Sequence, residues 1–136
     1  MKIQNGSIIP GVGISNIKLG ITKEKLLEFI GENYQEQPLE IGSLIVIENA
    51  KFWIADDGKV DQIGVEKDFG GKYEEIIGLG STLNDLKRYI GDYVQVYDTY
   101  ELKDIKGICF ELEDIDDWDE LKAPIDHIYV FRIELE

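Results

Sequence analysis

The sequence predicts an α+β fold in which two tandem helix-plus-antiparallel-strand repeats form one sheet, with both helices packed on one face. Three observations predict it. A length of 136 residues fits a single domain, residues 1–136. A helix signature recurs at a spacing of 60 residues, and strand-like alternation follows each copy. We expect the repeats to span about residues 17–67 and 77–134.

The helix signature is the clearest internal match. Residues 19–31 (LGITKEKLLEFIG) and 79–91 (LGSTLNDLKRYIG) share six of thirteen positions. Each copy has a Thr suited to cap a helix, Leu and Ile at helical spacing, and a Gly suited to end it. Because any short helix favours these residues, convergence is the alternative to duplication. In either case we expect two helices of about nine or ten residues that need a sheet to dock on.

Strand-like alternation of β-branched and aromatic residues follows each helix. The expected strands lie near residues 39–48, 51–55 and 60–67 in the first copy, and near 93–102, 106–113 and 125–134 in the second. Residues 56–59 (DDGK) indicate a hairpin. The last strands also match, since VDQIGV at 60–65 resembles IDHIYV at 125–130. Residues 68–72 and 10–16 are expected to be turns.

The composition excludes several function classes. The net charge of -14 and the pI near 4.4 disfavour nucleic acid or an anionic membrane surface as a partner. One cysteine, Cys109, permits no internal disulfide, and one histidine, His127, forms no His cluster. We therefore expect no metal and no cofactor. The N-terminal residues have no apolar signal segment, so we expect a cytoplasmic location.

The sequence contains no catalytic constellation that we recognise, so we expect a protein that is not an enzyme. His127 lies in an alternating strand, where a lone His is usually a satisfied or exposed surface residue. Cys109, between Ile108 and Phe110, is interpreted as a small packed side chain. The glycine pairs lack the dinucleotide-binding pattern. A small enzyme that uses two carboxylates as acid and base stays the alternative.

The richest concentration of acids lies in residues 111–120. Residues 93–136 carry 13 acids and 4 bases, against 15 acids and 10 bases in residues 1–92. The segment lacks the glycine and closing glutamate of a calcium loop, which leaves chance binding of a divalent ion open. One interpretation is a solvated acidic loop, and the other is a recognition loop with an aromatic anchor. The predicted partner-binding residues are Asp114, Asp116, Asp117, Trp118, Asp119 and Glu120.

Two repeated motifs carry a family resemblance. Ile-x-Leu-Gly-x-Thr at residues 17–22 precedes the first helix, and Leu-x-x-x-Ile-Gly at 26–31 runs through its end; residues 79–82 and 86–91 match in the second copy. This arrangement resembles the folds grouped with the β-lactamase inhibitor protein and with small outer-membrane assembly lipoproteins. The sequence departs from the lipoproteins in having no cysteine near residue 1 that could be acylated, and from the inhibitor protein in having no pair of cysteines that could form a disulfide.

The chain also resembles bacterial immunity proteins of the polymorphic or contact-dependent growth inhibition type, which are small, acidic and cytoplasmic. The resemblance implies a non-catalytic protein that neutralises a cognate toxin. A basic partner, such as a nuclease, would suit the acidic surface. An acidic adaptor or subunit without a toxin partner is a further alternative.

Overall fold

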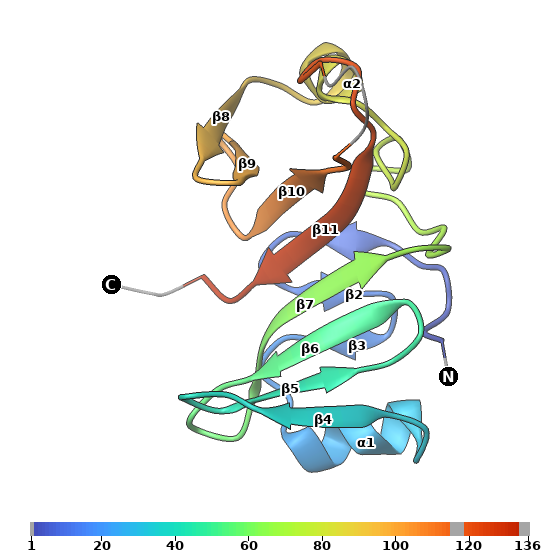
Figure 1. Cartoon of the computed structure of the whole chain (residues 1–136), viewed down its shortest axis with the longest axis vertical. Coiled ribbons are helices and arrows are strands. Elements are labelled where there is room, and N and C mark those ends of the chain that lie inside the picture. The colour runs from blue at the N-terminus through green and yellow to red at the C-terminus, as the bar shows by residue number, and fades with distance from the viewer. Residues whose placement is uncertain (1, 115–118, 134–136) are drawn as a thin grey trace.

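The computed structural model describes residues 2–114 and 119–133, which form a mostly β protein with two short helices (Figure 1). The helices are α1 (Lys23–Ile30) and α2 (Leu83–Tyr89). The strands are β1 (Ile8–Ile9), β2 (Gly13–Ile14), β3 (Ile17–Lys18), β4 (Gln35–Pro38), β5 (Ser43–Val46), β6 (Ala50–Ile54), β7 (Val60–Glu66), β8 (Tyr93–Val96), β9 (Thr99–Leu102), β10 (Ile108–Leu112) and β11 (Ile125–Phe131).

Eight strands form one antiparallel sheet in the order β4-β5-β6-β7-β11-β10-β9-β8. The element order is repeated along the chain, because α1 precedes β4 to β7 and α2 precedes β8 to β11. The last strand of each half lies at the centre, where β7 pairs with β11. The hairpin expected at residues 56–59 is confirmed, with Gly58 in the left-handed conformation at φ 79°.

The strands that follow the two helices do form one antiparallel sheet, but the sequence prediction missed a second, three-stranded sheet formed by β1, β2 and β3. Residues 10–16, expected to be only a turn, contribute β2 to it. Its two-residue strands are too short to show an alternating pattern, and they are stable because they cover the large sheet. In Figure 1 they lie behind it.

The number of strands in each half was also underestimated, since each half has four rather than three. The strand expected at 93–102 is a hairpin of β8 and β9, with Tyr97 at its turn in a left-handed conformation, φ 56°. No glycine marks this turn, so the usual hairpin signal is absent. In the first half, residues 35–38 form β4, and residues 39–42 connect it to β5.

Both helices begin where the sequence predicts, for local reasons. The Thr22 side chain accepts a hydrogen bond from the Lys25 N–H at 3.2 Å. Thr82 and Asp85 form a reciprocal capping box at the start of α2. The helices have eight and seven residues, which is slightly shorter than expected.

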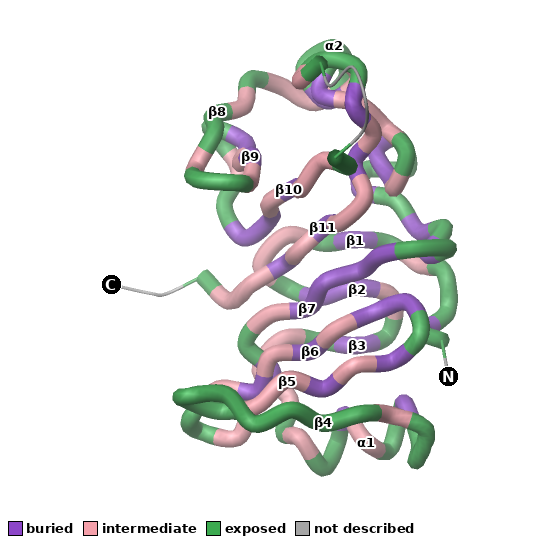
Figure 2. Tube along the Cα trace, in the orientation of Figure 1, coloured by how far each residue is buried: buried purple, intermediate pink, exposed green. Residues whose placement is uncertain are grey.

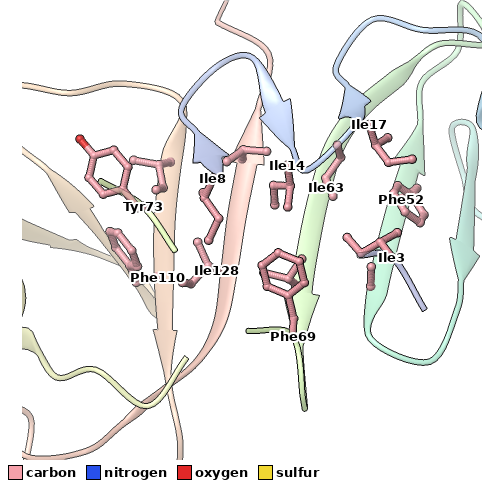
Figure 3. Packing of buried hydrophobic residues seen from close by; sticks show 14 of the residues in the cluster. Ile3, Ile8, Ile14, Ile17, Phe52, Ile63, Phe69, Tyr73, Phe110 and Ile128 are labelled. Carbon is pink, nitrogen blue, oxygen red and sulfur yellow. The ribbon is translucent and has the colours of Figure 1, made fainter. Parts of the chain in front are cut away.

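The core lies between the large sheet and β1 to β3 (Figure 3). Three isoleucines of the small sheet, Ile8, Ile14 and Ile17, are at most 2% exposed. They pack in one cluster with inward side chains of the large sheet, including Phe52 and Phe110, which are fully buried. Figure 2 shows that burial is concentrated on the central strands, whereas the edge strand β4 is exposed.

The two halves repeat the same backbone hydrogen bonds. The Gly20 N–H donates to the Val60 carbonyl at 2.8 Å, and the Gly80 N–H donates to the Ile125 carbonyl at 2.8 Å. The register between β7 and β11 is symmetric, because Gly64 lies opposite Tyr129, its counterpart in the aligned sequences. A local twofold axis therefore passes between these two residues.

Candidate functional site

The outer face of the large sheet, opposite the core, carries a row of ionisable side chains that crosses β7, β11 and β10. Strand pairing places Glu66 of β7 beside His127 of β11, and His127 beside Glu111 of β10. The equivalent row across β11, β7 and β6 instead holds Phe131, Gln62 and Trp53. Uncharged residues therefore fit the equivalent positions of the sheet. The charges of Glu66, His127 and Glu111 are not needed to form this fold.

A β-bulge adds a fourth ionisable residue to this row. The pairing of β10 with β11 shifts after Glu111, so that Asp126 is the extra residue between two paired ones. Adjacent residues of a regular strand point to opposite faces, but a bulge re-aims a side chain. As a result, Asp126 Oδ1 lies 2.8 Å from Nδ1 of its neighbour His127. We call Glu66, Glu111, Asp126 and His127 the His127 cluster.

His127 has carboxylates at both ring nitrogens. Its Nε2 lies 2.9 Å from Glu66 Oε2. Its Nδ1 lies 2.8 Å from Asp126 Oδ1 and 3.1 Å from Glu111 Oε1. Burial disfavours a charged imidazole, but the hydrogen bonds to Asp126 and Glu66 and the charge of Glu111 outweigh it and raise the pKa of His127. The cluster therefore favours a positive charge at the imidazole.

Glu66 is the most buried acid of the cluster, with a side chain that is 10% exposed. Burial alone would raise the pKa of this carboxyl, but Lys51, His127 and Lys67 lower it below its ordinary value. Lys51 Nζ lies 3.5 Å from Glu66 Oε2, and Lys67 Nζ lies 3.7 Å from Oε1. Glu66 is thus a buried anion compensated by three cationic groups.

Aromatic rings hold the cluster on one side. Tyr129 stacks on His127 with ring centroids 5.8 Å apart and an interplanar angle of 3°. Its hydroxyl lies 3.4 Å from Glu111 Oε1, and burial raises the pKa of that hydroxyl well above its ordinary value. Trp53 meets the edge of Tyr129 at 5.9 Å. This packing restricts the position of the imidazole.

Cys109 lies directly opposite Tyr129 on β10 and is partly buried. Burial, together with the charges of Glu101 and Glu111, raises the pKa of its thiol to about 12. A thiol of this kind is protonated at neutral pH and is a poor nucleophile.

A surface pocket of about 500 Å³ lies beside the cluster. Glu66, Asp126 and His127 line it together with Leu79, Pro124 and Glu113. The Glu113 N–H donates to the Pro124 carbonyl at 2.8 Å, which closes the base of the intervening acidic loop. The loop that contains the predicted partner-binding residues therefore leaves the sheet and returns to it beside this pocket.

The structure places three of the six predicted partner-binding residues. Asp114 and Asp119 are exposed, and Glu120 is half-buried. The predicted contacts Asp116, Asp117 and Trp118 lie outside the described residues. Asp119 Oδ1 accepts a hydrogen bond from the Leu121 N–H at 2.9 Å, which shapes the return of the loop.

Sequence reasoning missed the His127 cluster as a unit. Glu66 and His127 are 61 positions apart, and only the pairing of β7 with β11 joins them. One signal was present: Asp61 and Asp126 are the matching acids of the two aligned strands. Both are the extra residues of bulges, but Asp61 contacts Arg132 at 2.9 Å rather than a histidine.

Comparison with known proteins identifies the fold alone. No protein-family model and no curated protein sequence matches the chain. One similar crystal structure is that of the uncharacterized protein YfeY from Escherichia coli, with a TM-score of 0.52 and 11% sequence identity. The match covers 96% of this chain and 100% of that one. None of the helices in the described ranges has the length and apolar character needed to cross a membrane.

Proposed function

We propose that this chain is a non-catalytic immunity protein that neutralises a cognate basic toxin domain, with a nuclease as the first candidate. The observation that carries the proposal is the position of the acidic loop, which leaves the sheet at Glu113 and returns at Pro124, beside the pocket that Glu66 and Asp126 line. Acidic groups of the loop and of the sheet thus adjoin one another at this end of the molecule.

Electrostatics supports a basic partner. The net charge is -14, and the C-terminal 44 residues hold 13 of the 28 acids and only 4 of the 14 bases. Opposite charges accelerate encounter and disfavour wrong partners. A nuclease binds a polyanion and therefore presents a basic surface, which an acidic inhibitor would cover.

The repeated architecture supports the resemblance to inhibitor folds. We infer that the two halves are tandem repeats whose helices both cover the inner face, because Leu26, Ile30, Leu83 and Leu86 belong to the same buried cluster as the inward side chains of the sheet. This arrangement leaves the outer face and the acidic loop for a partner.

The test is whether the neighbouring reading frame encodes a basic toxin domain and whether this chain binds it. We expect a stable complex whose association slows in Asp114→Asn/Asp119→Asn and becomes less sensitive to salt. Glu32→Gln/Glu40→Gln removes the same charge from exposed positions far along the chain and is the matched control. Trp118→Ala should mainly speed dissociation, at a cost of about 2 kcal/mol or more if Trp118 is an anchor. The absence of any binding would overturn the proposal.

One observation favours the second candidate, a small carboxylate-dependent enzyme. A pocket lined by Glu66 and His127, both with shifted pKa values, is typical of active sites. A general acid, however, needs a raised carboxyl pKa, whereas the pKa of Glu66 is lowered. The lowered pKa of Glu66 therefore argues against Glu66 as the acid of such a pair, while the pocket itself is the observation that favours an enzyme. If the chain binds no toxin but a different basic protein, we would conclude that it is an acidic adaptor.

A further inference from the structure

We propose that Glu111, Asp126 and His127 form a binding site for one divalent transition-metal ion of the zinc class. One ligand atom from each residue, Nδ1 of His127 and a carboxylate oxygen of each acid, lies within 4.8 Å of the other two. This inference does not depend on the proposed toxin partner, since the site lies within the chain itself.

The donor set fits such an ion. Zinc binds imidazole nitrogen and carboxylate oxygen at about 2.0–2.2 Å, which places tetrahedral ligand atoms roughly 3.3–3.6 Å apart. The distances from His127 Nδ1 to Asp126 Oδ1 and Glu111 Oε1 are 2.8 and 3.1 Å. These two distances would lengthen by a few tenths of an ångström on binding the ion, and the two carboxylate oxygens already lie within 4.8 Å of each other. Three protein ligands also leave a fourth position for water or a partner's side chain.

Nε2 of His127, which would not contact the metal, has a carboxylate partner, as metal-binding histidines usually do. Histidines that bind metal usually donate the free ring N–H to a carboxylate, which sets the tautomer and orientation. His127 Nε2 lies 2.9 Å from Glu66 Oε2. Glu66 is nine-tenths buried and is held by Lys51 and Lys67. With the Nε2 proton directed to Glu66, the lone pair of Nδ1 points to Asp126 and Glu111.

The two carboxylates beside His127 Nδ1, those of Glu111 and Asp126, also favour a cation at this position. Within residues 2–114 and 119–133, no lysine or arginine forms an ion pair with Glu111 or Asp126, and His127 is the only basic group beside them. A single Nδ1 proton can serve one strong hydrogen bond, yet two carboxylate oxygens converge on this atom. A divalent ion would neutralise both.

The first half of the molecule supplies an internal comparison. Asp61 occupies the equivalent bulge, but the residues that correspond to His127 and Glu111 are Gln62 and Trp53. Asp61 is neutralised by Arg132. The same backbone geometry therefore carries a ligand set in one half and an ion pair in the other, and Asp61→Asn is a matched control for Asp126→Asn.

The experiment is titration of the metal-free chain with Zn²⁺ by calorimetry, with circular dichroism and thermal unfolding to verify that each variant is folded. We expect one site per chain, lost in Asp126→Asn and in Glu111→Gln/His127→Gln and unchanged in Asp61→Asn. Glu66→Gln, which alters the group behind the ring, should weaken binding about 10–100-fold. Equal affinity in wild type and Asp126→Asn, or loss in Asp61→Asn, would overturn the proposal.

The single histidine permits a second readout on the folded wild-type chain. In ¹⁵N–¹H spectra of the imidazole, Zn²⁺ should perturb Nδ1 strongly and leave Nε2 protonated. Metal bound at Nε2 would also overturn the proposal, because Glu111 and Asp126 lie at the other ring nitrogen. Saturation by Zn²⁺ without any change in the ring nitrogens would overturn it too, because the ion would then be bound by other acids of the surface.

Discussion

Substitution of Gly64 by alanine tests the packing at the local twofold axis. A Cβ at this position would lie 2.7 Å from Tyr129 Cδ1 and 2.8 Å from Cε1. The tyrosine ring cannot move freely, because it stacks on His127, meets the edge of Trp53 and points its hydroxyl at Glu111. The added methyl group must therefore displace a ring held by three contacts.

Two opposing effects set the magnitude of this substitution. Alanine gains about 0.5–1 kcal/mol over glycine within a strand, because less backbone entropy is lost on folding. Overpacking of a close-packed contact costs about 1–3 kcal/mol. We expect the steric cost to prevail and Gly64→Ala to lower the free energy of unfolding by about 1–2 kcal/mol.

The assay is urea unfolding of wild type, both single variants and the double variant. With the ring removed by Tyr129→Ala, the added methyl group meets little resistance, so Gly64→Ala should then be neutral or stabilise by up to about 1 kcal/mol. The sign of the Gly64 effect should therefore change between the two backgrounds. Equal destabilisation in both would refute the reasoning that the ring is the obstacle.

Three further predictions concern the core, the helix caps and the thiol. Phe110→Ala should lower the free energy of unfolding by about 3–5 kcal/mol, measured by urea denaturation, because Phe110 is fully buried; a cost below 1 kcal/mol would contradict its placement. Thr82→Ala should cost about 0.5–2 kcal/mol by the same method and more than Thr22→Ala, since only Thr82 belongs to a capping box. Cys109 should react slowly with iodoacetamide at pH 8, because its pKa of about 12 keeps it protonated. The alkylation rate should rise about tenfold per pH unit below that pKa while the chain stays folded, and fast reaction at pH 8 would show that the thiol is not buried.

The candidate site was only partly predictable from the sequence. His127 stands out in the sequence as the only histidine, but a lone histidine in a strand pattern predicts only a satisfied or exposed surface residue. Glu111 is visible only as part of an acidic run, and no sequence pattern marks Glu66 as a site residue. Their convergence depends on the register of three strands, which no local pattern specifies.

Features that are encoded within a few neighbouring residues could be predicted from the sequence. Thr22 and Thr82 start the two helices through their own hydrogen bonds, and Gly58 supplies the left-handed residue of the hairpin. The alternation of apolar residues in β11, where Ile128 and Val130 are buried, likewise indicates its inward face. The capping and turn preferences act through neighbouring atoms, so the local sequence is enough to predict them.

The small sheet, the turn at Tyr97 and the His127 cluster depend on contacts between distant parts of the chain, which no short stretch of sequence specifies. The two-residue strands β1 to β3 have no stability of their own, and they exist because Ile8, Ile14 and Ile17 are buried against the large sheet. The pairing of β7 with β11 joins residues that are about 60 positions apart. Such pairing is selected by the burial of whole faces at once, a collective free energy that no short stretch of sequence contains.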